Sequence, residues 1–523
     1  MNLFWKQKKL QNELKRNYSL REMEQKVIDM LQEYTGENLL DCSIKEEFRK
    51  TLEEHRRTVS ESIRSCCSGN PGAKDTVVRL IQSFLRKELK EEHIKVGRLV
   101  SFENPKQISA WHQMETLIYL FDKEKSNCGF GRMCDYFGWS DASVITEQQI
   151  YQAYVEKMSM LTEQDEIEVL SQILYASTVG LGIVDTLNQQ SGFIEEIQIG
   201  MSGKPELQYD YRLAMKEGKK EEGFSRNGVH IMARGCTIWL QFLSFETEEE
   251  LQRVLRNLIK ESQGGELTRN HPMLVVDAVD GRRISVSRPP MTDTWVGLIR
   301  KFDTVKEVSL EKLYKGYPEE KLLPGLLRQL VRSGRNIAIT GEMASGKTTL
   351  FRACLAEAKQ DMNIRVIEVD SFELNVRVFL PKANCMTMRV TEQTPAEEVL
   401  AFARKTTGQI FAIGEINSAA VAAMAMDLSK IASQMFFSAH YITTEHMIAD
   451  FVNAKLCIGG YSEESLAELD VVRCLGFDVH LRNKEGRRYV QYINEIVPVA
   501  RNSSKKGKTY EIRQIYHYDS NKE

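Results

Sequence analysis

The sequence predicts an α/β protein whose C-terminal part is a doubly wound parallel sheet. Three observations support this class. Apolar runs alternate with helical patterns, a glycine-rich loop joins the first of those runs to a helix, and a charged helical region precedes both. Parallel strands need crossover helices, and the alternation supplies them. The strands are expected at residues 336–340, 364–369, 387–390, 409–413 and 435–439.

Length and composition limit the possibilities further. A chain of 523 residues is too long for one hydrophobic core. We expect a helical N-terminal region, a mixed α/β domain, a linker, a phosphate-loop domain and a polar tail. Their bounds are 1–165, 166–302, 303–325, 326–500 and 501–523.

The composition is that of an ordinary globular protein, with 42% hydrophobic and 27% charged residues and a formal net charge of -3. This charge favours neither nucleic acid nor an anionic membrane as a partner. Ten scattered cysteines without a C-x-x-C pair indicate neither a zinc ribbon nor a disulfide framework, so we expect a cytoplasmic protein. No apolar run approaches the roughly 20 residues of a transmembrane helix, so any membrane role is expected to be peripheral.

Local signals define elements in the first 302 residues. Ser19 and Glu22 form a capping box ahead of an apolar helical stripe. The residues before it, 3–14, are read as a solvated or partner-packed helix, with a membrane-surface helix as the alternative. Thr247 is expected to cap a second amphipathic helix, and strands 274–278 and 283–286 are expected to form a hairpin around Asp280 and Gly281.

The most informative motif is G-x-x-x-x-G-K-T at residues 341–348, which lies between a predicted strand and a predicted helix. Its glycines let backbone N–H groups surround a phosphate, and the lysine adds a positive charge against the β and γ oxygens. The motif therefore predicts nucleotide binding, with the Thr348 hydroxyl as a ligand of Mg²⁺. The expected binding residues are Gly341, Ala344, Ser345, Gly346, Lys347, Thr348 and Thr349.

Hydrolysis also needs carboxylates at the ends of neighbouring strands. Glu415 ends the apolar run 409–413 in a Walker B layout and is a candidate for holding Mg²⁺ through water. Glu368 and Asp370 end the strand after the loop helix, and either is a candidate general base. His440 ends a further strand, where it is either a γ-phosphate sensor or a structural histidine.

With these motifs in order, the chain resembles the secretion ATPases of type II and type IV systems and type IV pili, and is most similar to the Tad/Flp pilus assembly ATPases. The resemblance extends from about residue 174 to about residue 497. Its landmarks are residues 182–187, 194–197, 280–283, 288–290, 299–302, 334–336, 413–415 and 438–440.

The resemblance implies a RecA-like P-loop domain, a preceding mixed α/β (PAS-like) domain and a homohexameric ring. It also implies recruitment by membrane platform proteins to the inner face of the plasma membrane, where the ring powers pilus assembly or secretion. Arg282, Arg288 and Arg300 match basic residues that reach the phosphates from the N-terminal side, and we count Arg282 and Arg300 among the catalytic candidates.

Several family residues are replaced in this chain. Ile416, Asn417 and Ser418 stand where an arginine usually follows the Walker B acid, and Met343 and Ala344 replace the usual Thr-Gly of the loop. A nucleotide-sensing scaffold that hydrolyses weakly or not at all is therefore the alternative function. A nucleic-acid translocase is a further rival, but no basic face with interleaved aromatics supports it, and no nucleic-acid partner is expected.

Overall fold

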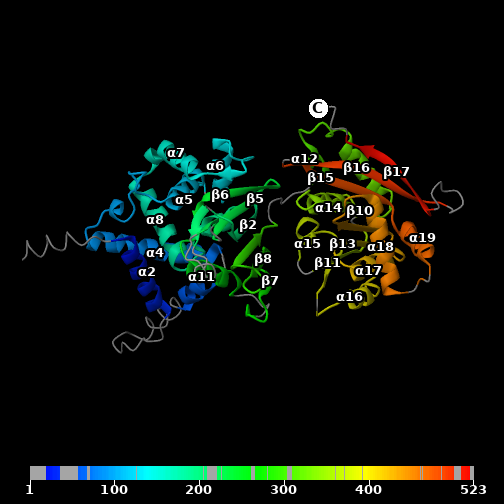
Figure 1. Ribbon diagram of the computed structural model, residues 1–523, viewed down its shortest axis with the longest axis horizontal. Helices are drawn as coiled ribbons and strands as arrows, with labels where there is room; N and C mark the ends of the chain where they lie inside the picture. The colour runs from blue at the N-terminus through cyan, green and yellow to red at the C-terminus, as the bar shows by residue number, and fades with distance from the viewer. Residues whose placement is uncertain are drawn as a thin grey trace, which may run out of the picture. The chain divides into compact units, whose positions relative to one another are not determined.

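The computed structural model consists of two compact units, Met1–Thr304 (unit 1) and Val305–Glu523 (unit 2), which are described separately (Figure 1). The residues it describes are 19–35, 57–66, 71–124, 126–203, 205–208, 221–224, 227–260, 266–278, 281–302, 309–359, 361–369, 372–391, 393–459, 461, 463–484, 486–499 and 508–518.

Unit 1 begins with helices. The predicted capping box is confirmed, since the Ser19 N–H donates to the Glu22 carboxylate at 2.9 Å and the Glu22 N–H donates to Ser19 Oγ at 3.3 Å. Short 3-10 turns occur at Val96–Arg98, Met158–Met160 and Gly182–Val184. The helices are α2 (Leu20–Thr35), a helix at 57–66, α4 (Pro71–Glu91), α5 (Ala110–Phe121), α6 (Gly129–Phe137), α7 (Glu147–Lys157), α8 (Glu163–Thr178), α9 (Asp185–Gln189) and α11 (Glu248–Ile259).

The sheet of unit 1 has the strand order β1-β6-β5-β2-β9-β8-β7. Its strands are β1 (Val144–Ile145), β2 (Ile194–Met201), β5 (Gly228–Ala233), β6 (Cys236–Ser244), β7 (Met273–Asp277), β8 (Arg283–Ser287) and β9 (Val296–Arg300). Strands β3 (Pro205–Gln208) and β4 (Glu221–Phe224) pair separately. The predicted hairpin is confirmed as β7 and β8, although Asp280 lies outside the described residues.

One hydrophobic core runs through unit 1, from Met23 on α2 to Ile299 on β9. Helix α11 contributes its buried stripe, and the Thr247 hydroxyl caps it as expected, accepting from the Glu250 N–H at 3.2 Å. The sequence-based boundary at 165/166 falls inside α8. The N-terminal helices and the mixed sheet therefore share one packed interior.

Unit 2 is built on the strand order β12-β11-β13-β14-β10-β15-β16-β17. The first six strands are parallel, and β16 and β17 extend the sheet in antiparallel fashion. All five predicted strands are present, whereas the last three were not predicted. The bounds are β10 (Ile337–Gly341), β11 (Ile364–Val369), β12 (Cys385–Val390), β13 (Ile410–Ile416), β14 (Gln434–Ala439), β15 (Phe477–Lys484), β16 (Arg487–Pro498) and β17 (Tyr510–His517).

Helices cover both faces of this sheet, as Figure 1 shows. Helices α12 (Leu310–Tyr314), α13 (Leu323–Arg332), α14 (Lys347–Ala356) and α15 (Val376–Phe379) pack on one face. Helices α16 (Ala396–Ala403), α17 (Ala419–Ser429), α18 (Thr444–Ile458) and α19 (Glu464–Cys474) pack on the other. Successive strand residues alternate between the two layers, for example Phe436 and Phe437. The expected α/β class, with a doubly wound RecA-like domain, is confirmed.

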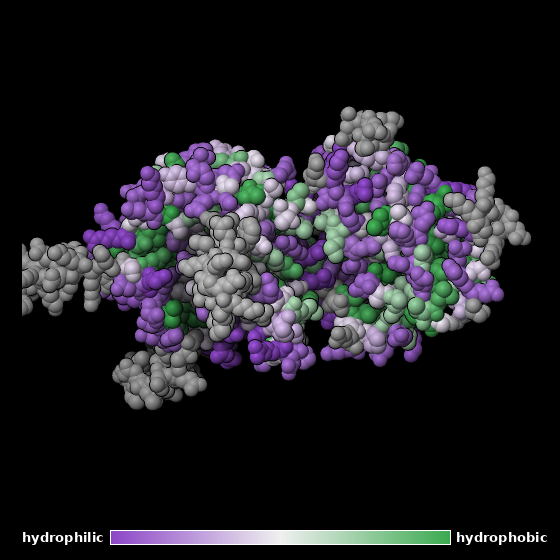
Figure 2. Space-filling model, in the orientation of Figure 1, coloured by the Kyte–Doolittle hydropathy of each residue, from purple (hydrophilic) through white to green (hydrophobic). Residues whose placement is uncertain are grey.

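Among the described residues, no helix combines the length and apolarity that crossing a bilayer requires. On the face drawn in Figure 2, hydrophilic and hydrophobic residues are interspersed over both units.

The packing of α11 on β9 generates a prediction. Leu255 is fully buried, and a Cβ added at Gly297 would lie 2.3 Å from its Cδ2. We expect Leu255→Ala to cost about 2–5 kcal/mol and Gly297→Ala about 1–3 kcal/mol. The double variant should lose less than the sum, because the new methyl group enters the vacated space. All five tryptophans precede residue 304, so urea unfolding followed by tryptophan fluorescence reports on unit 1; strictly additive losses would contradict the contact.

Candidate nucleotide-binding site

The phosphate loop follows β10, whose five residues are all buried. Gly341 has φ +140°, and a Cβ there would lie 2.2 Å from the Leu481 carbonyl oxygen on β15. Gly346 has φ +91° and is the N-cap of α14. Glycine is therefore required at both ends of the loop, at the first by close backbone approach and at the second by a left-handed conformation. Ala344 also has a positive φ, of +58°, which is uncommon for alanine.

Side chains brace the loop from within. The buried Ser345 hydroxyl donates to the Glu342 carbonyl at 2.8 Å. Lys347 Nζ crosses the loop and donates to the carbonyls of Glu342 at 2.7 Å and Gly341 at 3.1 Å. Thr348 and Thr349 are half-buried in the first turn of α14. The N–H groups of this turn and the positive end of the helix dipole suit the binding of an anion, and anion binding at this turn stays a prediction.

His440 links the loop to the predicted Walker B acid. Lys347 Nζ lies 3.2 Å from His440 Nδ1, and His440 Nε2 lies 3.3 Å from Glu415 Oε1. Since the lysine ammonium can only donate, Nδ1 accepts and Nε2 carries the hydrogen that faces Glu415. The structure thus brings together three predicted site residues that are far apart in the sequence.

Strand geometry places these residues together. Strand β14 lies between β10 and β13, and the carboxyl ends of parallel strands meet at one edge of the sheet. The register of β13 against β14 shifts between Ile413 and Ile416, and Ser438 Oγ donates to the Gly414 carbonyl at 2.5 Å within this irregularity. Such a bulge changes the direction of a side chain, and here it falls at Glu415.

Of the two candidate general bases, only Glu368 lies among the described residues. Glu368 on β11 is buried, and its Oε2 accepts from the N–H groups of Glu373 at 2.5 Å and Leu374 at 2.8 Å. A Cβ at Gly414 would lie 3.3 Å from Glu368 Cγ, so this side chain lies beside the residue that precedes Glu415. Asp370 lies outside the described residues. The choice between Glu368 and Asp370 stays open.

The predicted phosphate-contacting arginines all belong to unit 1. Arg282 is buried and donates from Nη1 to Asn188 Oδ1. The Arg288 guanidinium lies over the Trp295 ring, 4.8 Å from its centroid, and Arg300 is exposed at the end of β9. Their role towards a nucleotide stays a prediction.

A buried polar network supports the loop strand from β15. Asp478 is fully buried, and its carboxylate accepts from the hydroxyls of Thr340 and Thr444, each at 2.6 Å. His480 Nδ1 lies 2.9 Å from Thr340 Oγ1, and Asn494 Nδ2 donates to Thr444 Oγ1 at 2.8 Å. Burial raises the pKa of Asp478 to about 6, against the opposing effect of the two hydroxyls. Burial lowers the pKa of His480 to about 4.

Asn483, which was not among the predicted site residues, holds the loop from the β15 side. The Asn483 N–H donates to Glu342 Oε1 at 2.8 Å, and Asn483 Nδ2 donates to the Ala344 carbonyl at 3.4 Å. The available signal was the segment 483–486, whose asparagine and glycine favour a turn. Strands β15 and β16, which flank this turn, were harder to recognise, because the polar residues Asp478 and His480 occupy buried positions on β15.

The described residues contain no group of three or more His, Cys, Asp or Glu side chains that could hold a metal ion. Nucleotide-bound Mg²⁺ takes most of its ligands from phosphates and water, with one or two protein oxygens. The half-buried Thr348 hydroxyl beside the loop and the half-exposed Glu415 carboxylate fit that smaller role.

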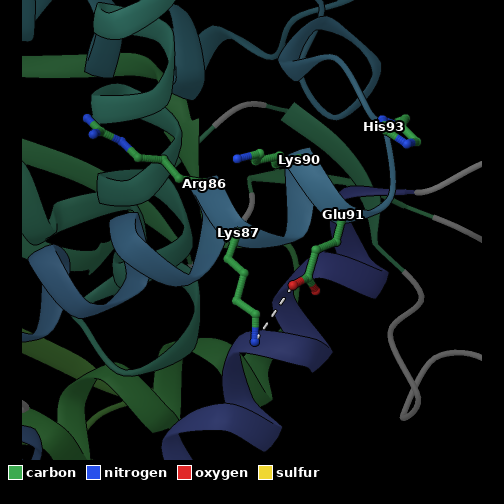
Figure 3. Close-up of a pocket in the computed structure, with 5 residues that line it drawn as sticks. All are labelled: Arg86, Lys87, Lys90, Glu91 and His93. Atoms are coloured by element: carbon green, nitrogen blue, oxygen red, sulfur yellow. Dashed lines mark ion pairs between the residues drawn. The ribbon is translucent and has the colours of Figure 1, made fainter.

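A basic hollow of about 650 Å³ lies on α4 in unit 1 (Figure 3). Its lining residues are Arg86, Lys87, Lys90, Glu91 and His93. Lys87 pairs with Glu91 at 4.0 Å, and both side chains are exposed. Exposed pairs of this kind contribute little energy.

Comparisons with known proteins found similar solved structures but no similar sequence. No family model and no curated protein sequence matches the chain. Similar solved structures include the VirB11 ATPase of the Brucella suis type IV secretion system in complex with sulphate, at 17% identity and a TM-score of 0.27, covering 62% of this chain and 90% of that one. The Legionella pneumophila ATPase DotB has 11% identity and a TM-score of 0.36, covering 63% and 78%.

The pilus retraction motor PilT with bound ADP has 14% identity and a TM-score of 0.36, covering 61% of this chain and 78% of that one. All these TM-scores are below 0.5. The assignment of the site therefore depends on the loop and its neighbours in this chain.

The close approach at Gly341 generates a prediction. Gly341→Ala should place a methyl group against the Leu481 carbonyl, which is backbone and cannot turn away. We expect a loss of stability of about 1–3 kcal/mol or more and loss of nucleotide binding. Gly325→Ala is the matched control, since its Cβ would meet nothing within 4 Å. Calorimetry and titration with a fluorescent nucleotide would check both; wild-type binding by Gly341→Ala would contradict the loop geometry.

The buried Asp478 carboxyl predicts a pH dependence of stability. Its folded pKa of about 6 exceeds its ordinary value of 3.8, so the folded state holds the proton more tightly. The resulting destabilisation is absent below pH 3.8, grows as pH rises to 6, and reaches about 3 kcal/mol above it. Relative to wild type, Asp478→Asn should gain stability over this range. Calorimetry at several pH values measures the difference, and a pH-independent difference would refute the assignment.

Proposed function

We propose that this chain is an ATPase that binds ATP at residues 341–349 and hydrolyses it. The observation that carries the proposal is the contact of His440 with both Lys347 and Glu415. A loop that only bound phosphate would need no such link to a carboxylate on β13. A histidine between the loop lysine and the acid gives the γ-phosphate position a direct connection to the hydrolytic residues.

In this proposal, phosphate oxygens replace the carbonyls of Gly341 and Glu342 as partners of Lys347. The first-turn N–H groups of α14 hold the β-phosphate, and Glu368 or Asp370 accepts the proton of the attacking water. Mg²⁺, held by Thr348 and through water by Glu415, would neutralise charge on the β and γ oxygens. His440 would report loss of the γ-phosphate through its contact with Lys347.

The arginines of unit 1 form a further part of the proposal. Closure of unit 1 over the nucleotide would bring Arg282, Arg288 or Arg300 to the phosphates and add positive charge only in the closed state. This would couple hydrolysis to motion between units. The sequence landmarks shared with the secretion ATPases, which run in order from residues 182–187 to 438–440, support this coupling.

The same sequence landmarks support a proposal about the cellular role of this chain. We propose a homohexameric, peripherally recruited ATPase at the inner face of the plasma membrane, working with platform proteins to drive Tad/type IV-like pilus assembly or type II/IV secretion. A scaffold that senses ATP without useful hydrolysis is the alternative, motivated by Ile416, Asn417 and Ser418 in place of the usual arginine.

Two substitutions separate binding from hydrolysis. Lys347→Ala should weaken ATP affinity by about 10- to 100-fold, since it removes a charged partner of the phosphates. Glu415→Gln should bind ATP within a few-fold of wild type and lower kcat by about 100-fold or more. Fluorescent-nucleotide titration and phosphate release measure the two effects.

Lys359→Ala, an exposed residue just after α14, is the control and should change neither quantity. Turnover that survives Lys347→Ala would exclude this site. If Glu415→Gln supports pilus assembly or secretion in cells while Lys347→Ala abolishes it, the scaffold alternative is correct.

A further inference from the structure

The hairpin of β15 and β16 forms one side of the phosphate loop. Gly341 and Leu481 are paired in the parallel register of β10 and β15. Just beyond this pair, Asn483 donates to the Glu342 carboxylate and to the Ala344 carbonyl. The hairpin therefore fixes the first half of the loop through backbone and side-chain contacts.

Arg488 extends the same arrangement to the second half of the loop. It is the antiparallel register partner of Asn483, and residues paired in this way project from the same face of a sheet. A Cβ added at Gly346 would lie 3.3 Å from Arg488 Cδ and 3.9 Å from Arg488 Cβ. The aliphatic stem of this half-buried arginine thus packs directly on the N-cap of α14.

From this placement we propose that Arg488 is a nucleotide-binding residue, which pairs with the phosphates of ADP and ATP from the β15 side of the loop. The inference rests on the proposed ATP site. A guanidinium binds phosphate oxygens in a bidentate manner and keeps its charge at any physiological pH.

The electrostatics of the loop favour this role. The N-terminus of α14 is a positive helix end, and Lys347 already adds a cation there. Arg488, packed beside Gly346, adds a further positive charge to this end of the loop, and the combined positive potential attracts the phosphates of a nucleotide.

The position of Arg488 in the sheet also predicts whether it contributes to nucleotide binding or to hydrolysis. Strand β10 has β14 on one side and β15 on the other. His440 follows β14, while Arg488 belongs to the hairpin on the β15 side. We therefore expect Arg488 to contribute to affinity for ADP and ATP alike, and not to the cleavage of the γ-phosphate.

The test uses the full chain and three variants. Arg488→Met keeps an unbranched stem on Gly346 but removes the charge, and Arg488→Lys keeps a charge. Arg482→Met is the control, an exposed arginine on the same hairpin. Titrations with fluorescent ADP and ATP at several salt concentrations give the affinities, and phosphate release at saturating ATP gives kcat.

Arg488→Met should weaken the binding of both nucleotides by about 10-fold or more, with a shallower salt dependence. Arg488→Lys should recover part of the loss, Arg482→Met should bind normally, and kcat should stay within a few-fold of wild type. Normal nucleotide affinity in Arg488→Met, with or without lower thermal stability, would overturn the inference, as would a loss confined to kcat. Failure of the wild type to bind either nucleotide would overturn the proposed function itself.

Discussion

The phosphate loop depends on the pairing of β10 with β15. This pairing brings the Leu481 carbonyl against Gly341, where a side chain of any size would be excluded. One residue earlier, the Thr340 hydroxyl donates to the buried Asp478 carboxylate. Asp478 also accepts from Thr444 at the start of α18, so this one carboxylate joins the loop strand, its neighbour and the helix that follows β14. Burying a carboxylate costs free energy, and its hydrogen bonds hold the Thr340 and Thr444 hydroxyls in fixed positions.

Strand β10 lies between β14 and β15, and the contacts on these two sides of the loop differ in kind. On the β14 side, His440 and Glu415 are partly exposed, so the contact of His440 with Lys347 is screened by water and can exchange for a contact between Lys347 and a phosphate. On the β15 side, buried hydrogen bonds hold the strand in one geometry. A rigid side and an exchangeable side together explain how one loop can keep its shape while its lysine changes partners.

The sequence predicted five of the six parallel strands, and the loop, because their signals are local. The apolar run 409–413 and the glycines of the loop indicate strand and turn without reference to distant residues. The β15–β17 extension escaped prediction because the partners of Asp478 and His480 come from β10, α18 and β16. The bond between Arg282 and Asn188 joins residues 94 positions apart, and no spacing rule anticipates it. Buried polar residues in a strand look like loop residues when their partners are unknown.

Buried polar contacts join helix α4 of unit 1 to the segment that binds Arg282. Lys74 on α4 forms a buried ion pair with Asp185 at 2.5 Å and a hydrogen bond to Gln189 at 2.9 Å, both on α9. Next to Gln189 in sequence, Asn188 accepts from Arg282. Removing one partner of a buried pair leaves a charge without compensation, which costs about 3–5 kcal/mol. The helices before residue 165 therefore support the segment that orients Arg282, and an arginine clamp on the nucleotide would depend on them without their touching it.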